Sequence, residues 1–329
     1  MRKAILAILL LFVLTSQANR PKVGLVLGGG GAKGGAEVGV LKVLEEVGIE
    51  PDIIVGTSIG SIVGGLYAAG YSAIELDQLF CQQEWLSLLT DRREDLSGEP
   101  FKQVDGVTYI FGFPVIDTNN MAFGVLKGEK VEQAIDSMLS QKNCSSFKQL
   151  AIPFCCVAAS MATMEEVDLK AGDLSRAIRA SMAIPGLFKP VEIEGRQLVD
   201  GGLMNNLPVD VAKEMGADFV IAIDLQQNKP KTREEKSNII TDIADLLGIG
   251  PIAKWILNRP DITKYNDNCQ QAELYIHPSI ADYDASSFGN ENMRHMITIG
   301  EQEARKHLEA LQKVAERTQK KTLWDFLKL

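Results

Sequence analysis

Four consecutive glycines near the start of the chain lie between a short apolar run and a segment with helical periodicity. They are Gly28 to Gly31, and Gly34 follows three residues later. The apolar run, Val23–Leu27, has the length and composition of a buried parallel strand. Apolar residues then recur at near-helical spacing over residues 38–47. A strand that enters a helix through a glycine loop indicates an α/β fold, with backbone N–H groups converging at the helix N-terminus.

Three further apolar runs also have the character of buried strands. Each is bounded by glycine, proline or acidic residues, and a second helical segment, residues 59–69, follows the first of them. Alternating strands and helices predict a mainly parallel sheet covered by helices on both faces, a three-layer α/β sandwich. Within one run, the adjacent Cys155 and Cys156 are expected to point to opposite faces of the sheet. The runs are residues 53–55, residues 152–158 and Phe219–Ile223.

The glycine loop has two chemical interpretations. Its spacing, Gly29-x-Gly31-x-x-Gly34, matches the dinucleotide-binding fingerprint. That fingerprint requires an acidic residue at the end of the second strand, where this chain has glycine, threonine and serine instead. The other use of such a loop is to hold an anion on its backbone N–H groups, as an oxyanion hole does during acyl transfer.

A nucleophile motif occupies the turn after that second strand. The segment from Gly56 to Gly60 reads Gly-x-Ser-x-Gly with Ser58 at its centre, between a predicted strand and a predicted helix. This is the setting of a nucleophile elbow, in which flanking glycines relieve crowding and the serine hydroxyl is exposed. The motif and its context together predict Ser58 as a nucleophile.

The base that would activate Ser58 is less obvious from the residues. The chain has three histidines: His277 precedes a proline, and the other two fall on a polar helical segment. An acidic alternative is Asp200, which ends a short apolar strand and is followed by two glycines. Taken alone, such an aspartate is more often a turn residue. A Ser58–Asp200 pair and a triad with His277 therefore both stay open on this reasoning.

Taken together, the glycine loop, the serine motif and the Asp200 segment resemble the patatin-like phospholipase family. The family pattern is G-G-G-x-[RK]-G, then G-x-S-x-G, then D-G-[GA], in that order along the chain. A fourth block, residues 180–190, is similar to the family segment that precedes the aspartate strand. The resemblance runs from about residue 23 to about residue 224 and is strongest to bacterial members similar to neuropathy target esterase.

This resemblance implies a lipid acyl hydrolase of the phospholipase A or lysophospholipase type, with Ser58 as nucleophile and Asp200 as general base. It implies a phospholipid or lysophospholipid substrate and no metal or cofactor, and an acyltransferase would use the same groups. Apolar residues around Ile59, Ile184 and Leu187 are expected to keep the carboxylate dry and so more basic. The implied oxyanion donors are Gly29, Gly30 and Gly31, and the supporting motif residues are Lys33, Gly34, Gly56, Gly60, Gly201 and Gly202.

Two positions depart from the common family pattern. Many relatives have arginine at the position of Lys33, and often histidine at that of Glu37. Lysine keeps the positive charge but lacks the forked donors of arginine, and we expect Lys33 either to attract an anionic head group or to cap the glycine loop. Two alternatives to this hydrolase stay open, an α/β-hydrolase-like esterase that uses His277 and a non-enzymatic lipid-binding protein on the same scaffold.

The chain divides into three predicted segments. Residues 1–18 combine Arg2 and Lys3 with an apolar run and small residues, which predicts a secretory signal peptide cleaved after Ala18. Residues 19–225 are expected to form the catalytic domain, in which residues 90–125 are an insertion of loop or hairpin character over the site. Residues 226–329 are expected to form a mainly helical extension packed on that domain, with helices over residues 239–257 and 293–314.

Net charge limits the partners of the protein. The formal net charge of −9 argues against nucleic acid as a partner and against adsorption to anionic lipid by charge alone. Contact with a membrane would therefore be peripheral and would depend on apolar residues. The signal peptide predicts an exported protein that is periplasmic, associated with an outer membrane, or secreted.

Overall fold

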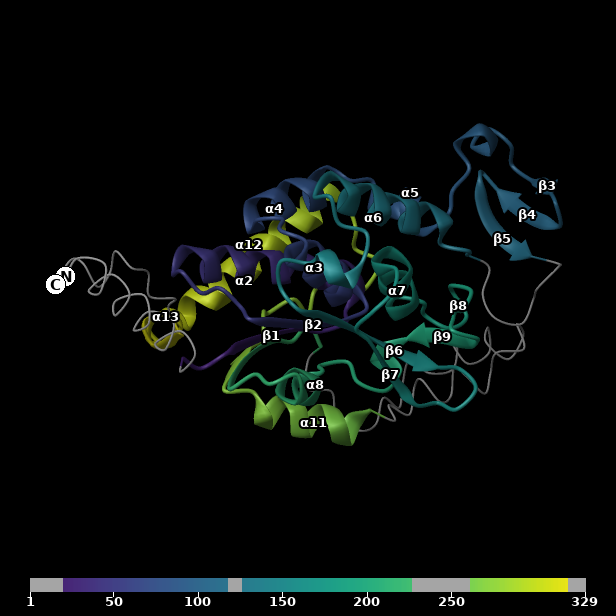
Figure 1. Ribbon diagram of the computed structural model, residues 1–329. Coiled ribbons are helices and arrows are strands. Elements are labelled where there is room, and N and C mark those ends of the chain that lie inside the picture. Colours follow the sequence, from purple (N-terminus) through teal and green to yellow (C-terminus); the bar gives the residue numbers. More distant parts are fainter. Residues whose placement is uncertain (1–19, 118–125, 227–260, 319–329) are drawn as a thin grey trace, which may run out of the picture.

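The central sheet joins segments that are far apart in the sequence (Figure 1). The computed structural model of the protein describes residues 20–117, 126–226 and 261–318. The sheet has eight strands in the order β11-β10-β1-β2-β6-β9-β8, and β7 pairs with β6. Five strands pair in parallel: β1 (Val23–Leu27), β2 (Ile53–Thr57), β6 (Phe154–Ser160), β10 (Phe219–Ile223) and β11 (Leu274–Ile276). The others pair antiparallel with their neighbours: β7 (Glu166–Leu169), β8 (Val191–Ile193) and β9 (Arg196–Asp200).

Helices cover both faces of the sheet (Figure 1), and the sheet separates two hydrophobic cores. In β1, Leu25 and Leu27 pack into one core and Val26 into the other, and Cys156 and Cys155 divide between them in the same way. The expected three-layer α/β sandwich with a mainly parallel sheet is therefore confirmed. One layer contains α2 (Gly35–Glu46), α3 (Ile59–Ala68), α4 (Ala73–Gln82) and α12 (Asn290–Lys306), and the opposite layer contains α8 (Val209–Glu214) and α11 (Ile262–Gln271). Shorter or peripheral helices are η1 (Gly31–Gly34), α5 (Trp85–Leu89), η2 (Glu94–Leu96), α6 (Glu129–Gln141), η3 (Phe147–Gln149), α7 (Leu174–Ser181), η4 (Gly201–Leu203) and α13 (Leu308–Thr318).

Most predicted elements differ from the structure only at their ends. β1 and β10 have the predicted bounds, whereas β2 continues to Thr57 and β6 starts and ends two residues later than expected. The single helix predicted over residues 293–314 is two helices, α12 and α13. They are separated because the N–H of His307 bonds to the carbonyl of Ala304, three residues back, which interrupts the α-helical pattern.

The C-terminal part of the chain contributes to the central sheet as well as to a helical layer. The sequence patterns did not predict β11, which lies parallel to β10. In the helical layer, α12 packs along α2. The two helices approach so closely that a Cβ at Gly300 would lie 1.9 Å from the carbonyl oxygen of Ala36. The largely helical character of this part is confirmed, while the domain boundary at residue 225 stays a prediction. The predicted signal peptide and the predicted helix over residues 239–257 lie outside the described residues.

A small antiparallel sheet projects from the body beside α5 (Figure 1). It consists of β3 (Lys102–Val104), β4 (Val107–Ile110) and β5 (Phe113–Asp117), in that order. This is the segment for which the sequence predicted an insertion of loop or hairpin character, and its described part is a three-stranded meander of two hairpins.

Candidate active site

Ser58 occupies the sharp turn between β2 and α3. Its backbone has φ 56° and ψ −121°, a conformation that costs a non-glycine residue about 1–3 kcal/mol. The flanking glycines are needed because the turn is crowded: a Cβ at Gly60 would lie 2.3 Å from the carbonyl oxygen of Leu27. A Cβ at Gly56 would likewise lie 2.3 Å from the carbonyl oxygen of Gly60. The predicted strand–turn–helix setting of the serine is present.

Hydrogen bonds from neighbouring serines hold this strained turn. The backbone N–H of Ser58 donates to Ser181 Oγ at 3.0 Å, and the hydroxyl of Ser181 donates to the carbonyl of Val157 at 2.5 Å. Ser61 Oγ contacts the same hydroxyl at 2.7 Å and donates to the carbonyl of Gly56 at 2.9 Å. Ser181 ends α7 and belongs to the block of residues 180–190 that the sequence singled out. Its role at the elbow was not predicted.

The sheet topology brings Asp200 to the serine. β9 runs antiparallel to β6, so its last residue, Asp200, pairs with Ala158 and returns to the level at which β2 ends. Ser58 Oγ donates to Asp200 Oδ2 at 2.7 Å. The other carboxylate oxygen accepts the N–H of Gly202 at 2.7 Å. The two residues that the sequence named as catalytic are therefore in direct contact.

Burial changes the acid–base chemistry of this contact. Ser58 is 8% exposed and Asp200 is 6% exposed. Desolvation raises the pKa of Asp200 to about 6, although the hydrogen bonds from Ser58 and Gly202 act in the opposite direction. A carboxylate with this pKa is a stronger base than an ordinary aspartate and is still mostly ionised at neutral pH.

The glycine loop faces Ser58 and is held by Asn206. The N–H of Gly29 donates to the carbonyl of Asn206 at 3.2 Å, and Asn206 Nδ2 donates back to the carbonyl of Gly29 at 3.0 Å. The sequence motifs had not indicated a role for Asn206, although it follows the Asp-Gly-Gly segment by only a few residues. Among the described residues, the N–H groups of Gly30 and Gly31 have no such acceptor. Of the three glycines implied as oxyanion donors, Gly29 therefore already has its N–H bonded, whereas in the described part of the chain Gly30 and Gly31 do not.

The C-terminal part of the chain supports the other side of this loop. The N–H of Ala32 donates to the carbonyl of Ala285 at 3.0 Å. Gly31 has φ 62°, and a Cβ there would lie 2.5 Å from the same carbonyl oxygen, so only glycine fits this position without displacing the segment. Gly34 and Gly201 are equally confined, by Ile59 and by the backbone of Val157.

An apolar cavity of about 300 Å³ opens beside Ser58. Its wall combines α5, the start of α3, Leu126, residues 182–188 and residues 285–288. All three residues expected to exclude water, Ile59, Ile184 and Leu187, line it. This volume is at the lower end of the range for ligand pockets, about 300–1,000 Å³.

His277 belongs to a different polar cluster. It follows β11, which lies three strand spacings from β2 in the sheet, about 14 Å. His277 Nδ1 contacts the carbonyl of Asp224 at 3.0 Å, and the carboxylate of Asp224 accepts from the hydroxyls of Tyr265 and Tyr275. The structure therefore does not join His277 to Ser58, and the Ser–Asp–His alternative loses its geometric basis.

Two further charged residues flank the glycine loop. Glu37 on α2 is fully buried, and neither of its carboxyl oxygens has a hydrogen-bond partner among the described residues. Burial raises the pKa of Glu37 well above its ordinary value and the charge of Asp224 raises it further, while the nearby backbone N–H of Gly28 acts in the opposite direction. Lys33 is partly exposed in η1. Hydrogen bonds from Ser286 lower the pKa of Asp284, and the charge of Lys33 lowers it further.

Over the described ranges, no group of three or more His, Cys, Asp or Glu side chains is arranged to hold a metal ion. No helix in the same ranges is long and apolar enough to cross a membrane.

Comparison with known proteins identifies this arrangement. The family model described as patatin-like phospholipase matches residues 25–213, a range that contains the glycine loop, Ser58 and Asp200. The chain belongs to the patatin-like phospholipase family. Family membership supports a lipid esterase in general terms and leaves the substrate open.

Several patatin-like relatives are similar over most of the chain. An uncharacterized NTE family protein of Mycobacterium tuberculosis is 32% identical over 226 residues, which cover 68% of this chain and 55% of the relative. Patatin-like phospholipase domain-containing protein 6 of Homo sapiens is 36% identical over 62% of this chain and 13% of its own length. Lysophospholipase nte1 of Emericella nidulans is 29% identical over 82% and 17%. The chain thus aligns with about half of the mycobacterial relative and with much less of the other two.

A solved structure is also similar. VipD from Legionella pneumophila aligns over 88% of this chain and 67% of its own, with a TM-score of 0.43 and 16% sequence identity.

Proposed function

We propose that the chain is a lipid acyl hydrolase that cleaves the ester of a phospholipid or lysophospholipid, with Ser58 as nucleophile and Asp200 as general base. The observation that carries this proposal is the 2.7 Å hydrogen bond from Ser58 Oγ to Asp200 Oδ2 beside an apolar cavity. The lysophospholipase name of the fungal relative agrees with this substrate class.

The first step forms an acyl-enzyme. Ser58 Oγ attacks the ester carbonyl carbon while Asp200 accepts the hydroxyl proton, and the carbonyl oxygen becomes an oxyanion. The N–H groups of Gly30 and Gly31 are the proposed donors to that oxyanion. When the intermediate collapses, the glycerol oxygen leaves and takes the proton from Asp200. The fatty acyl group stays on Ser58.

The second step repeats this chemistry with water. Asp200 accepts a proton from the water that attacks the acyl carbonyl, and the fatty acid leaves as Ser58 recovers its proton. An alcohol in place of water would give an acyltransferase with the same residues. Asp200 suits both steps because desolvation raises its pKa to about 6.

The cavity supports an acyl chain as the part of the substrate held by the protein. Its walls are mainly apolar side chains from separate segments of the chain, and Ser58 lies in one wall. Each methylene moved from water into such a site contributes about 0.8 kcal/mol. Lys33, partly exposed at the glycine loop, is proposed to attract an anionic head group or to stabilise the loop.

The decisive experiment measures fatty-acid release from mixed phospholipid and lysophospholipid with a chelator present. Wild type and His277→Ala are expected to be active, while Ser58→Ala and Asp200→Asn should lose at least about 10³-fold in rate, as expected for the loss of nucleophile or base. A folded but inactive His277→Ala variant would return the base role to histidine.

A fluorophosphonate probe separates the enzyme from a non-enzymatic scaffold. Wild type should be labelled at Ser58, and Ser58→Ala should not be labelled. A wild-type protein that binds lipid vesicles but neither reacts with the probe nor releases fatty acid would favour the lipid-binding alternative.

We also propose that the protein is exported, because residues 1–18 have the composition of a signal peptide. Mass spectrometry of protein made from the full sequence should find a mature chain that begins at Asn19. Recovery of the chain with residues 1–18 still attached, from the cytoplasmic fraction alone, would overturn this proposal.

A further inference from the structure

Exposed apolar side chains gather at one end of the small β3–β4–β5 sheet. Phe101 is 65% exposed and Phe111 is 51% exposed, and Ile110 is also exposed. Lys102 pairs with Tyr109, so continuing this register places Phe101 opposite Ile110, next to the Phe111 turn. We call these three residues, Phe101, Ile110 and Phe111, the apolar tip. Large apolar residues grouped on a surface indicate an interaction site.

The turn at Phe111 places an aromatic residue where such turns usually have a polar one. Phe111 and Gly112 form a two-residue hairpin turn in which both φ angles are positive, 48° and 82°. Such turns favour asparagine or aspartate before the glycine, and a bulky residue at positive φ is strained. Two comparable hairpins within the described residues have Asp105 and Glu194 at the same position. Phe111 therefore adds strain and exposed apolar surface where a polar residue would fold better.

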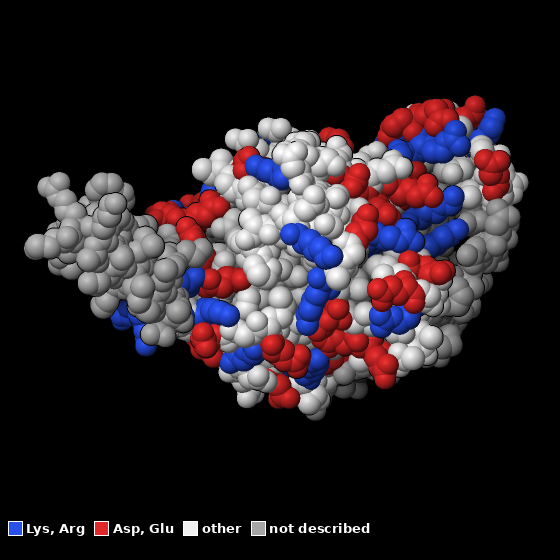
Figure 2. All heavy atoms as spheres, viewed as in Figure 1, with Lys and Arg blue, Asp and Glu red and all other residues white. Residues whose placement is uncertain are grey.

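The charges around the tip do not favour a partner of one sign. In the face shown in Figure 2, acidic and basic side chains are intermixed around the small sheet. Arg93 is paired with Asp95 and Arg92 with Glu94. The guanidinium of Arg92 also lies over the ring of Phe113, 4.8 Å from its centroid. Because these two arginines are paired with carboxylates, the contacts that the tip can make with a partner are apolar and aromatic rather than ionic.

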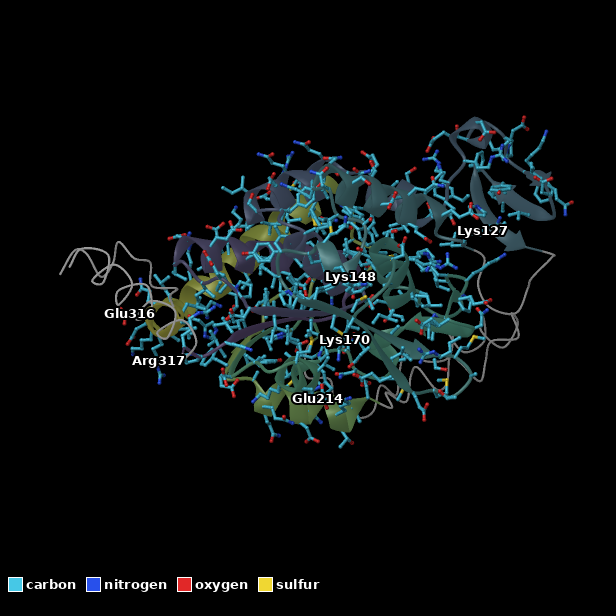
Figure 3. All side chains as sticks on the ribbon, viewed as in Figure 1. Lys127, Lys148, Lys170, Glu214, Glu316 and Arg317 are labelled. Carbon is cyan, nitrogen blue, oxygen red and sulfur yellow. The ribbon has the colours of Figure 1, made fainter. Side chains whose placement is uncertain are left out.

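The small sheet lies beside α5, a helix that lines the cavity (Figure 1). The chain enters the insertion from Thr90 and rejoins the body at Leu126, and both residues line the cavity. Leu126 N–H donates to the carbonyl of Leu187 at 3.0 Å. Figure 3 labels Lys127, the residue after Leu126, where the chain rejoins the body. The cavity rim itself exposes Leu86, Ile184 and Leu187.

We propose that the apolar tip and the exposed rim residues are one docking face for the surface of a phospholipid bilayer. A lipid surface fits because its acyl chains would pass from the bilayer into the cavity that the rim residues line. This inference depends on the proposed lipid hydrolase activity. It adds that the enzyme takes its substrate from a bilayer. Docking by apolar and aromatic side chains at a lipid interface depends little on salt or head-group charge.

The test uses Ser58→Ala as a background, so that vesicles stay intact, and measures co-sedimentation with phosphatidylcholine vesicles. Phe111→Asn creates the favoured Asn-Gly turn, so we expect equal or higher thermal stability together with vesicle binding about tenfold weaker. Ile110→Ser should weaken binding, whereas Ile74→Ser is the matched control, since Ile74 is 61% exposed on α4, outside the docking face. Binding by Phe111→Asn as strong as that of the background protein would overturn the proposal.

A second measurement separates docking from catalysis. In the active protein, Phe111→Asn should lower hydrolysis of vesicle lipid about tenfold and leave hydrolysis of a soluble butyrate ester unchanged. Loss of both activities would mean that the tip acts on the active site itself. A change of oligomeric state in Phe111→Asn would assign the face to a second copy of the chain. Either result would contradict docking on a bilayer. A protein that binds vesicles through the tip but hydrolyses neither substrate would leave docking intact and remove the proposed function.

Discussion

Asp200 is a carboxylate inside the protein, with one oxygen on the hydroxyl of Ser58 and the other on the N–H of Gly202. Its surroundings favour the neutral acid through desolvation, while its two donors favour the charged base. The pKa of about 6 is the balance of these effects. The carboxyl group of Asp200 therefore changes from the protonated acid to the ionised base just below neutral pH.

We therefore predict that the catalytic rate falls about tenfold per pH unit below pH 6 and levels above it, because only ionised Asp200 accepts the proton of Ser58. The measurement is kcat/KM for a soluble ester between pH 4.5 and 8.5. The rate of fluorophosphonate labelling should follow the same curve, since it reports Ser58 without release of product. An inflection near pH 7 that disappears in His277→Ala would contradict the assignment to Asp200.

Glu37 is the second buried carboxyl near the glycine loop, and it has no hydrogen-bond partner among the described residues. Burial raises the pKa of Glu37, with a further contribution from Asp224. The folded protein thus binds a proton at Glu37 that the unfolded chain releases above about pH 4.3. Its contribution to stability is full below that pH and is lost as the pH rises toward the folded pKa.

Glu37→Gln removes this titration, so the variant should gain stability over wild type as the pH rises above 4.3. Each unit of pKa difference corresponds to about 1.4 kcal/mol in the free energy of unfolding. Urea unfolding at pH 5, 6.5 and 8 measures the difference, and Glu316→Gln, at an exposed residue labelled in Figure 3, is the control. A stability difference that does not change with pH would show that Glu37 is already ionised in the folded protein.

At the scale of elements, the α2–α12 pair fixes the C-terminal part of the chain to the body. A Cβ at Gly300 would lie 1.9 Å from the carbonyl oxygen of Ala36, and one at Gly39 would lie 1.9 Å from that of Ile297. These neighbours are backbone atoms, so no side-chain rotation relieves the clash. Only glycine at both positions allows the two helices to lie this close.

Gly300→Ala is therefore expected to destabilise the protein although alanine favours helices. The gain in helix propensity is about 1 kcal/mol, whereas overpacking against backbone costs about 1–3 kcal/mol and here has no simple relief. Thermal or urea unfolding gives the net change, and Gly98→Ala, where a Cβ meets nothing within 4 Å, serves as control. Equal stability of Gly300→Ala and wild type would mean that α12 shifts without cost.

At the scale of the whole molecule, the cavity exists only because distant segments meet around Ser58. Ile62 on α3 is buried and lines the cavity, while Leu187 at the rim is 46% exposed, so Ile62 lies on the inner side. The C-terminal segment supplies Ala285 and Phe288 to the opposite wall. Acyl-chain length should therefore be limited by residues from both halves of the sequence.

Ile62→Phe is predicted to shorten the preferred acyl chain and Ile62→Ala to lengthen it. A change of one or two methylenes in an apolar pocket changes discrimination about tenfold or more. The measurement is the ratio of kcat/KM for a long-chain ester to that for a butyrate ester. If the two variants shift this ratio in the same direction, the cavity does not hold the acyl chain.

Patterns among neighbouring residues were enough to predict the local elements of this protein. The apolar runs predicted β1 and β10 with their bounds, and the strand–glycine–helix patterns predicted both the glycine loop and the turn at Ser58. These features depend on residues adjacent in the chain, and glycine at a crowded turn is a constraint that sequence patterns carry. The family resemblance added the pairing of Ser58 with Asp200.

Contacts between residues far apart in the chain follow from the three-dimensional arrangement of the strands. The direction of β9 places Asp200 on Ser58, and the position of β11 at the other end of the sheet places His277 on Asp224 instead. The bonds of Asn206 to Gly29 and of Ser181 to Ser58 also join residues more than a hundred positions apart. No local pattern marks such partners, because their identity depends on strand order and on which side chains burial leaves within hydrogen-bonding distance.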